Sequence, residues 1–362
     1  MPFIQRYPET KNSSLQPFNA ADQLLLTEAE SLLNNHSNIA LINDRFGFLT
    51  CHLAHRKPFV VIGYKSQEKA VRANLLSNKL EFDENLFLTP LDDFPDTLDI
   101  ALVKIPKSLE LFRLHLYQIH QSCGEQTMVL CGFMTKYFSK QLLKIAGEFF
   151  SSTEQSRARK KARLLILKKP KSNVSINLTD TIYWNGLKIV HYPGVFSSGK
   201  IDYATQFLLR HFTPFVDERR ILDMASGNGV IAAYIQRVFE RNGWTLPEIH
   251  LTDDNFTAVE SSKLNLPDSN CRHHFSDDLL IFEDDYFDLI VTNPPFHFGH
   301  EINTEVSMNL FTQVQKKLNP DGRFVLVFNR HLVNYRTLLK RLFPKIILIA
   351  DSPRYMALEC RK

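Results

Sequence analysis

Short apolar runs alternate with longer amphipathic stretches through the C-terminal half of the chain. The runs at residues 220–223, 249–253, 287–292 and 323–328 are nearly continuous in apolar side chains, which is typical of strands buried on both faces. A last segment, 345–358, is broken by polar residues at 351–354 and predicts an antiparallel hairpin. This alternation predicts an α/β fold with a doubly wound, mostly parallel sheet.

The N-terminal half repeats this order of apolar segments. Residues 39–47 align with 220–229, residues 60–63 with 249–253, and residues 98–107 with 287–296 without a gap. The polar residues differ, because only Gly47 remains in the first loop, no acid ends the second strand, and Lys104 stands in the place of Asn293. We therefore expect two tandem Rossmann-like folds, of which the N-terminal copy is degenerate. The alternative is a chance match of two α/β segments with similar rhythm.

Composition changes between the two halves. Residues 170–180 are rich in Pro, Ser, Asn and Thr and predict a linker, and residues 183–190 predict a short hairpin around Asn185 and Gly186. We expect a noncatalytic domain at residues 1–170, a linker and hairpin at 171–190, and a catalytic domain at 191–362.

The whole chain has 362 residues, 44% of them hydrophobic, which is enough for two cores of ordinary size. It contains no run of about twenty apolar residues, and its first residues lack the basic-then-apolar layout of a secretory signal. The five cysteines form no Cys-x-x-Cys pair, which argues against a metal site and a disulfide framework. We expect a cytoplasmic protein that holds no metal and has no membrane segment.

Positive charge is unevenly distributed, although the formal net charge of +4 is too small to identify a polyanionic partner. Residues 157–171 form a basic run around one short apolar strand. A phosphate backbone would suit the cations of this run, Arg157, Arg159, Lys160, Lys161 and Arg163. The alternative is a solvated edge strand whose lysines discourage aggregation.

A glycine loop follows the first C-terminal strand and precedes a helical stretch. Its small residues let the backbone pass close to a ligand, and a helix N-terminus favours polar or anionic groups. The candidate cofactor-binding residues in this loop are Asp223, Ala225, Gly227, Asn228 and Gly229. An acid opens the loop and no Lys-Ser/Thr follows the glycines, so the pattern favours an S-adenosylmethionine site over a phosphate cradle.

Two further acids follow strands of the same predicted sheet. Asp253 ends the second strand, where an acid can accept from both ribose hydroxyls of a nucleoside; the alternative is a helix N-cap, which Asp254 or Asn255 could also provide. Asp277 lies where the third strand should end and could accept from an adenine amino group. Asp278 is an equal candidate on spacing, and an acidic surface loop is the other alternative.

The tetrapeptide Asn293-Pro294-Pro295-Phe296 directly follows the strand at 287–292, at the edge where doubly wound sheets bind ligands. An exocyclic base amine is a poor nucleophile, since its lone pair is delocalised into the ring. The side-chain oxygen of Asn293 and the main-chain oxygen of Pro294 could each accept an N–H bond and hold that nitrogen in place, while Phe296 stacks on the base. The alternative is a rigid strand terminator with an incidental Asn.

Residues 194–202 precede the amphipathic stretch at 203–212. They could form a flap over the cofactor with Phe196 near its methionine end; a turn and a helix cap are the alternative.

Together these residues resemble bacterial ribosomal RNA guanine-N2 methyltransferases with a duplicated architecture. The similar motifs are Gly194-Val195-Phe196-Ser197, Asp202, residues 227–231, residues 293–297 and residues 329–332. Residues 329–332, with Asn43-Asp44, Phe46-Gly47 and residues 160–163, are closer to the large-subunit member. The resemblance implies seven-stranded sheets, S-adenosylmethionine as cofactor, 23S ribosomal RNA as substrate, and an N-terminal domain that assists RNA recognition.

The chain departs from this pattern at one position. The family loop usually begins Asp-Leu-Gly-Cys-Gly, whereas Ala225 here adds a methyl group where the backbone should pass near the cofactor. A negative φ would let Ala225 be tolerated; otherwise we expect weaker cofactor affinity.

Other readings of the same residues remain open. The acceptor could be 16S ribosomal RNA, adenine N6 or a protein glutamine amide, because an Asn-Pro-Pro-aromatic loop can orient any planar amide-like nitrogen. The chain could also be a noncatalytic RNA-binding protein with two degenerate halves. We expect a monomer.

Overall fold

Two sheets with the same strand order organise the chain. The computed structural model describes residues 1–10, 12, 14–33, 37–196, 199–294, 297–298, 301–302 and 304–362. These residues divide into unit 1, Met1–Leu178, and unit 2, Thr179–Lys362.

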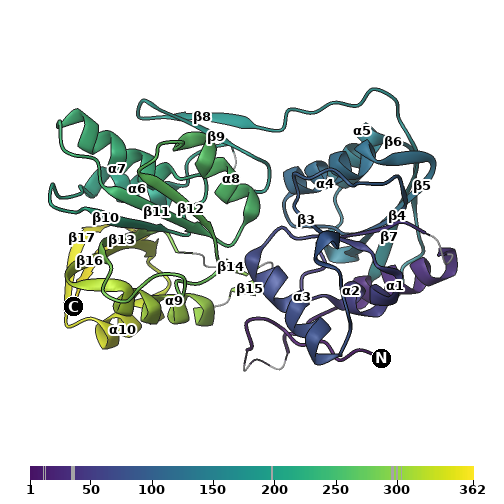
Figure 1. Cartoon of the computed structure of the whole chain (residues 1–362), viewed down its shortest axis with the longest axis horizontal. Coiled ribbons are helices and arrows are strands. Elements are labelled where there is room, and N and C mark those ends of the chain that lie inside the picture. The colour runs from purple at the N-terminus through teal and green to yellow at the C-terminus, as the bar shows by residue number, and fades with distance from the viewer. Residues whose placement is uncertain are drawn as a thin grey trace. The chain divides into compact units, whose positions relative to one another are not determined.

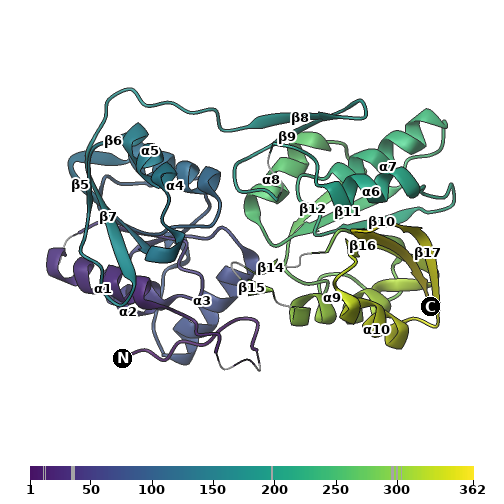
Figure 2. The same cartoon turned by 180° about the vertical axis from the view of Figure 1, so that it is seen from behind.

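Unit 1 contains a seven-stranded sheet in the order β3-β2-β1-β4-β5-β7-β6. Its strands are β1 (Ile39–Ile42), β2 (Phe59–Val61), β3 (Phe87–Leu88), β4 (Leu98–Lys104), β5 (Cys123–Met134), β6 (Phe150–Gln155) and β7 (Ala162–Pro170). Its α-helices are α1 (Ala20–Leu32), α2 (Phe48–Leu53), α3 (Lys65–Ser77), α4 (Leu109–Gln121) and α5 (Lys140–Phe149). Figure 2 shows α1, α2 and α3 on one face of this sheet and α4 and α5 on the other.

Unit 2 begins with the hairpin β8 (Asp180–Trp184) and β9 (Leu187–His191), and Asn185 and Gly186 at its turn both have positive φ. The strands of its seven-stranded sheet are β10 (Arg220–Met224), β11 (Glu248–Asp253), β12 (Cys271–Phe275), β13 (Phe287–Thr292), β16 (Leu318–Asn329), β17 (Lys345–Asp351) and β18 (Tyr355–Arg361). The remaining elements are α6 (Tyr203–His211), α7 (Val230–Arg241), α8 (Phe256–Asn265), β14 (His297–Phe298), β15 (Glu301–Ile302), α9 (Thr304–Lys317) and α10 (Val333–Leu342). In Figure 1, α6, α7 and α8 cover one face of the sheet and α9 and α10 the other.

The second sheet runs β12-β11-β10-β13-β16-β18-β17, which repeats the order of the first. In each unit the last two strands pair antiparallel with their neighbours, while the other pairs are parallel. The predicted tandem α/β fold with seven-stranded, mostly parallel sheets is therefore confirmed.

Strand register corrects the alignment of the two copies by one residue. Ile39 pairs with Ile100 in unit 1, and Ile221 pairs with Leu289 in unit 2. Since residues 98–107 match 287–296 without a gap, Ile39 corresponds to Ile221 and not to Arg220. The segments 39–47 and 221–229 then have equal length, and both end in a glycine with φ near +78 that precedes a helix, since φ is 77 at Gly47 and 79 at Gly229.

Apolar side chains on both faces of each sheet explain why these segments fold. In unit 2, one cluster packs α6 and α7 onto the sheet through Leu208, Ile235 and Phe239. A second packs α9 and α10 onto the other face through Phe311 and Leu339. The helices need only one apolar stripe each, whereas the central strands are apolar on both sides, as their sequence indicated.

Two general properties also bear on function. The five cysteines are free thiols. In the part of the chain that the structure describes, no helix is long and apolar enough to cross a membrane.

Candidate functional site

The carboxyl ends of β10, β11 and β13 lie side by side, because both β11 and β13 pair in parallel with β10. The glycine loop follows β10, Asp253 ends β11, and Asn293 follows β13. Three segments that are far apart in the sequence therefore meet at one edge of the sheet, which is the edge where doubly wound folds bind their ligands.

The glycine loop has the backbone conformation that its glycines predict. Gly227 and Gly229 have φ values of 55° and 79°, which lie in the left-handed region that favours glycine. A Cβ added at Gly227 would meet nothing within 4 Å, so open space adjoins the backbone there. At Gly229 it would lie 3.2 Å from side-chain atoms of Leu251 and Ser262, so that glycine instead allows close packing of the loop. Asn228 is buried in the same loop.

Ala225 also occupies the left-handed region, with φ of 55°. The condition under which Ala225 would be tolerated, a negative φ, is therefore not met. Its Cβ imposes a strain of about 1–2 kcal/mol that glycine would not have. In unit 1 the corresponding residue is Asn43, with φ of 61°, and Asn adopts this conformation more readily than Ala.

Asp223 is fully buried on β10 beneath this loop. Its Oδ2 accepts the backbone N–H of Ala232 in the first turn of α7, at 3.1 Å. Its Oδ1 accepts from no donor among the described residues. Burial raises the pKa of this carboxyl to about 8, because the charged form loses its hydration. A buried carboxylate with one unused oxygen is suited to a cationic or N–H-bearing ligand.

Asp253 links the glycine loop to the start of α8. One carboxylate oxygen accepts the N–H of Gly227 and the other accepts that of Asn255, both at 2.8 Å. Burial raises its pKa to about 6, and these two hydrogen bonds oppose that rise. The N-cap of α8 is Asn255, whose side chain accepts from Thr257, so the alternative role of Asp253 as the cap is not needed.

The third acid lies further along than its expected position. Strand β12 ends at Phe275, so Asp277 follows the strand by two residues and does not end it. Asp278 accepts the backbone N–H of Leu280 through Oδ1, which makes it part of a local turn.

The side-chain amide of Asn293 is held in one orientation. Its Nδ2 donates to Asp202 Oδ2 and to Thr205 Oγ1, each at 3.0 Å. Its Oδ1 is buried and accepts from no donor in the described part of the chain. A buried carbonyl oxygen without a donor costs about 1–3 kcal/mol, so this oxygen is a strong candidate for contact with a ligand N–H.

The other members of the predicted tetrapeptide are only partly described. Pro294 is buried directly after Asn293. Pro295 and Phe296 lie outside the described residues, and so does the part of the flap at 197–198.

The segment before α6 contains the helix cap that was one of the two alternatives for it. Asp202 is the N-cap of α6, and the carbonyl of Gly194 accepts from the side chain of Asn255 at 2.9 Å, so the segment is tied to the same edge of the sheet. The side chain of Phe196 is 67% exposed, so it packs against little of the protein.

Asp202 and Thr205 are the site residues that sequence reasoning missed as partners of Asn293. An Asp before an amphipathic stretch predicts a helix N-cap. It could not predict contact with a residue about ninety positions later, because that contact depends on where α6 packs on the sheet.

The basic run surrounds a tight hairpin turn between β6 and β7. Arg159 pairs with Ala162, and the two turn residues, Lys160 and Lys161, have φ values of 47° and 63°. Arg157 and these residues are exposed, whereas Arg163 is half-buried and donates to Gln155. The turn thus presents clustered positive charge at one end of the unit 1 sheet.

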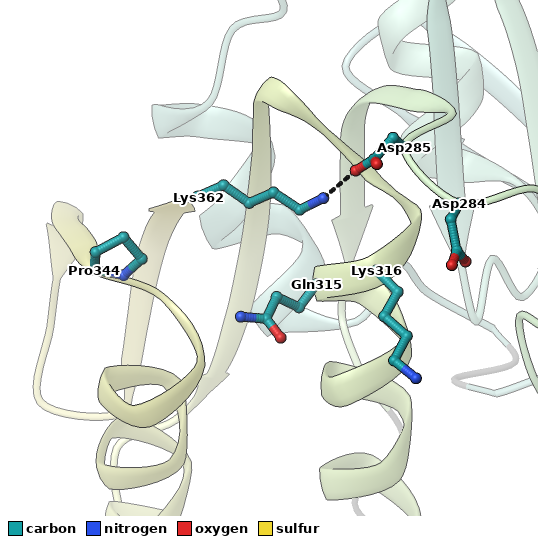
Figure 3. Close-up of a pocket in the computed structure, with 6 residues that line it drawn as sticks. All are labelled: Asp284, Asp285, Gln315, Lys316, Pro344 and Lys362. Carbon is teal, nitrogen blue, oxygen red and sulfur yellow. Dashed lines mark hydrogen bonds and ion pairs between the residues drawn. The ribbon is translucent and has the colours of Figure 1, made fainter.

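A concavity of about 410 Å³ is lined by Asp284, Asp285, Gln315, Lys316, Pro344 and Lys362. Figure 3 shows Lys362 paired with Asp285 across it. Asp284 and Asp285 precede β13, so this concavity lies at the opposite edge of the sheet from Asn293. Among the described residues, no group of three or more His, Cys, Asp or Glu side chains is arranged to hold a metal ion.

The sheet order of unit 2, its glycine loop, the buried acids and the strand-end Asn define a class of protein, the Rossmann-like methyltransferases. A family model described as the methyltransferase small domain matches residues 186–359, and another described as the RLMG N-terminal domain matches residues 3–172.

Relatives match along the whole chain. The chain is 30% identical to "Ribosomal RNA large subunit methyltransferase G" of Vibrio parahaemolyticus, covering 99% of this chain and 94% of the relative. It is also 30% identical to the protein of the same name from Streptomyces coelicolor, covering 99% and 97%. A solved T. thermophilus 16S rRNA N2 G1207 methyltransferase, in complex with AdoMet and guanosine, has a TM-score of 0.73 at 22% identity and covers 95% of this chain and 92% of that one.

The chain belongs to the ribosomal RNA large subunit methyltransferase G family. The predicted family, fold and enzyme class are therefore confirmed, and the chain is a methyltransferase.

Proposed function

We propose that this protein transfers a methyl group from S-adenosylmethionine to the exocyclic N2 amine of a guanine in 23S ribosomal RNA. The observation that carries the proposal is the fixed amide of Asn293, whose nitrogen is bound by protein and whose buried oxygen is left for a ligand N–H. Family membership supports the large-subunit RNA as substrate, since the relatives are named for it. The guanosine named with the 16S rRNA N2 methyltransferase of similar fold agrees with guanine as the base.

The residues at the carboxyl edge of unit 2 fit the cofactor. Within the described ranges, the backbone at Gly227 lies beside open space, and one buried oxygen of Asp223 accepts from no donor. We assign Asp223, Ala225, Gly227, Asn228, Gly229, Asp253, Asp277 and Phe196 to its binding. When bound, S-adenosylmethionine supplies a methyl group on a positively charged sulfur.

Asn293 and Pro294 act on the amine that receives the methyl group. The Oδ1 of Asn293 and the carbonyl of Pro294 each accept one N–H bond, which orients the nitrogen and favours its pyramidal form in the transition state. We assign Pro295 and Phe296 to the same step, Phe296 as the residue that would stack on the base. Orientation by fixed acceptors reduces the entropy cost of reaching the reactive geometry.

We assign recognition of the RNA backbone in part to the basic turn of unit 1. A two-residue turn with positive φ at both positions prefers Asn-Gly. Lys160 and Lys161 therefore make this turn less stable than Asn-Gly would, but they place two positive charges on it. Arg157, Arg159 and Arg163 add to the same charged end. The unit 1 fold would then serve RNA recognition, with the protein acting as a monomer in the cytoplasm.

The double variant Lys160→Asn/Lys161→Gly tests this assignment. It should stabilise the fold by a few tenths of a kcal/mol to about 1 kcal/mol, since it supplies the preferred turn residues. RNA affinity should fall. The slope of log affinity against log salt is negative and should become shallower by roughly 1.5–2. Unchanged affinity and salt slope would remove this turn from the RNA interface.

The reaction is tested by transfer of labelled methyl from S-adenosylmethionine to unmodified 23S and 16S ribosomal RNA, followed by nucleoside analysis. N2-methylguanosine in 23S RNA is the expected product, and Asn293→Ala should abolish it. Asn242→Ala is the matched control, because Asn242 lies at the opposite end of α7 from the glycine loop. Label in 16S RNA, in N6-methyladenosine or in protein instead would replace the proposed acceptor.

A further inference from the structure

Two hydrogen bonds decide which way round the Asn293 amide lies. The carboxylate of Asp202 can only accept, so it selects the nitrogen of the amide and repels the oxygen. The hydroxyl of Thr205 accepts from the same nitrogen, and so both N–H donors of the amide are used. The oxygen is therefore turned away from α6.

We infer that Asp202 and Thr205 are positioning residues for methyl transfer, and that the first turn of α6 fixes Asn293 so that its oxygen faces the substrate amine. This inference rests on the proposed function and names the residues that would hold the Asn293 oxygen in the orientation that the reaction needs.

The contact is rigid because it shares atoms with a helix cap. The same Oδ2 of Asp202 accepts the backbone N–H of Ala204 at 2.8 Å and that of Thr205 at 3.3 Å. Thr205 is 6% exposed, so water offers little competition for its hydroxyl. Asn293 is thus bound to a capped and buried helix start, which limits rotation of its side chain.

A purely structural tie between β13 and α6 is the competing explanation. Unit 1 has a comparable tie, since Lys104 at the end of β4 donates to Asn19, the N-cap of α1. The side chain of lysine, however, has no acceptor atom, whereas the amide of Asn293 has a buried oxygen that accepts from no donor among the residues the structure describes. A structural tie alone would not require that oxygen.

The variant pair Thr205→Val and Thr205→Ser separates the two explanations. Valine keeps the size of threonine but removes the acceptor, so one amide N–H is left unbound and the amide can turn. We expect kcat to fall about tenfold, as for loss of one hydrogen bond in the transition state. KM for RNA and the dissociation constant of S-adenosylmethionine should change less than about twofold. Serine should restore kcat.

Thr50→Val is the matched control, because Thr50 is a buried, hydrogen-bonded threonine of unit 1. Its kcat should equal that of the wild type even if its melting temperature falls. Asp202→Asn, which keeps an N-cap side chain but can present N–H to the amide, should lower kcat at nearly unchanged helix stability.

The outcomes distinguish this inference from the proposed function. If the wild type forms N2-methylguanosine and Thr205→Val is equally fast, or if serine fails as badly as valine, the positioning role is wrong. If the wild type forms no methylated guanine in RNA, the proposed function itself fails.

Discussion

Units 1 and 2 share one fold but use the carboxyl edge of the sheet differently. Lys104 and Asn293 occupy the same strand end. Each donates to the N-cap of the helix that precedes the first strand of its sheet, α1 or α6. Lys104 forms an ion pair with Asp22 as well, so its ammonium group binds two side chains of the protein. The same strand end thus carries a lysine with a structural contact in unit 1 and an asparagine with an acceptor oxygen for a ligand in unit 2.

The glycine loops differ in the same way. In unit 1, Asp44 lies inside the loop and accepts the N–H and hydroxyl of Thr50, the third residue of α2. In unit 2, Asp223 lies within the strand and one of its oxygens accepts from the third residue of α7; the other accepts from no donor in the described part of the chain. Gln67 in unit 1 binds Gly63 and Val61. Asp44 and Gln67 are therefore used in contacts within unit 1, whereas Asp223 keeps one oxygen that accepts from no donor among the described residues.

The largest expected effect comes from giving unit 2 the lysine of unit 1. Asn293→Lys should fold, because the lysine can pair with Asp202, but methyl transfer should fall by at least about 100-fold, since the amide acceptor is lost. Single-turnover assays with 23S RNA measure the rate. The reciprocal variant Lys104→Asn should leave the rate unchanged. A fall of less than about tenfold in Asn293→Lys would contradict the comparison.

Unit 2 contains a buried cluster of ion pairs where unit 1 has an apolar side chain. Arg323 binds Glu218 and Glu359 in unit 2, while strand register places Met128 at the matching position of unit 1. Arg323→Met would leave the buried Glu218 without its cation and Glu359 with Arg361 alone, and it should lower the free energy of unfolding by about 3–5 kcal/mol. Urea unfolding measures it, and Met128→Leu is the control. A loss below about 1 kcal/mol would show that the cluster is relaxed or hydrated.

Proton release on cofactor binding should reveal the charge state of Asp223. Because its pKa is raised to about 8 in the ligand-free fold, binding of a cationic cofactor should release a proton. Affinity should then fall by about tenfold for each pH unit below this value. Calorimetry in two buffers of different ionisation enthalpy measures the proton release. A pH-independent affinity would show that the Asp223 charge plays no part in binding.

The raised pKa of Asp223 also makes the stability of the ligand-free protein depend on pH, in the opposite direction to cofactor affinity. The folded state holds this proton more tightly than the unfolded chain, whose pKa is near 3.8, so the free energy of unfolding should decrease as pH rises from about 4 to about 8. Asp223→Asn should remove the contribution of Asp223 to that decrease and stabilise the ligand-free protein at neutral pH, while weakening cofactor binding.

The smallest effect concerns the strained loop residue. Ala225→Gly should raise the free energy of unfolding by about 0.5–1 kcal/mol, because relief of left-handed strain exceeds the added chain entropy of glycine. Cofactor affinity should rise slightly. Asn43→Gly at the matching position should change stability less, since Asn tolerates this conformation. Equal changes at both positions would contradict the account of Ala225.

Much of the fold could be predicted from the sequence because periodicity reports burial directly. The strand at 287–292 has the predicted bounds, and the last hairpin turns where its polar residues indicated. Register was predicted less well, since the match of 39–47 with 220–229 was wrong by one residue and only strand pairing resolved it.

The candidate site could be predicted where side chains follow strands, as with Asp253 and Asn293. Contacts made by packing could not, because Asp202 reaches Asn293 only after α6 docks on the sheet. The conformation of Ala225 was also beyond the sequence, since glycine pattern alone does not report φ.

The central claim is that unit 2 has a cofactor site and that side chains of unit 1 occupy the corresponding place there. The number of S-adenosylmethionine molecules bound per full chain tests it. Equilibrium titration of the whole protein should give one molecule per chain, and the double variant Asp223→Asn/Asp253→Ala should bind none. Two molecules per chain, or one that survives this double variant, would contradict the account.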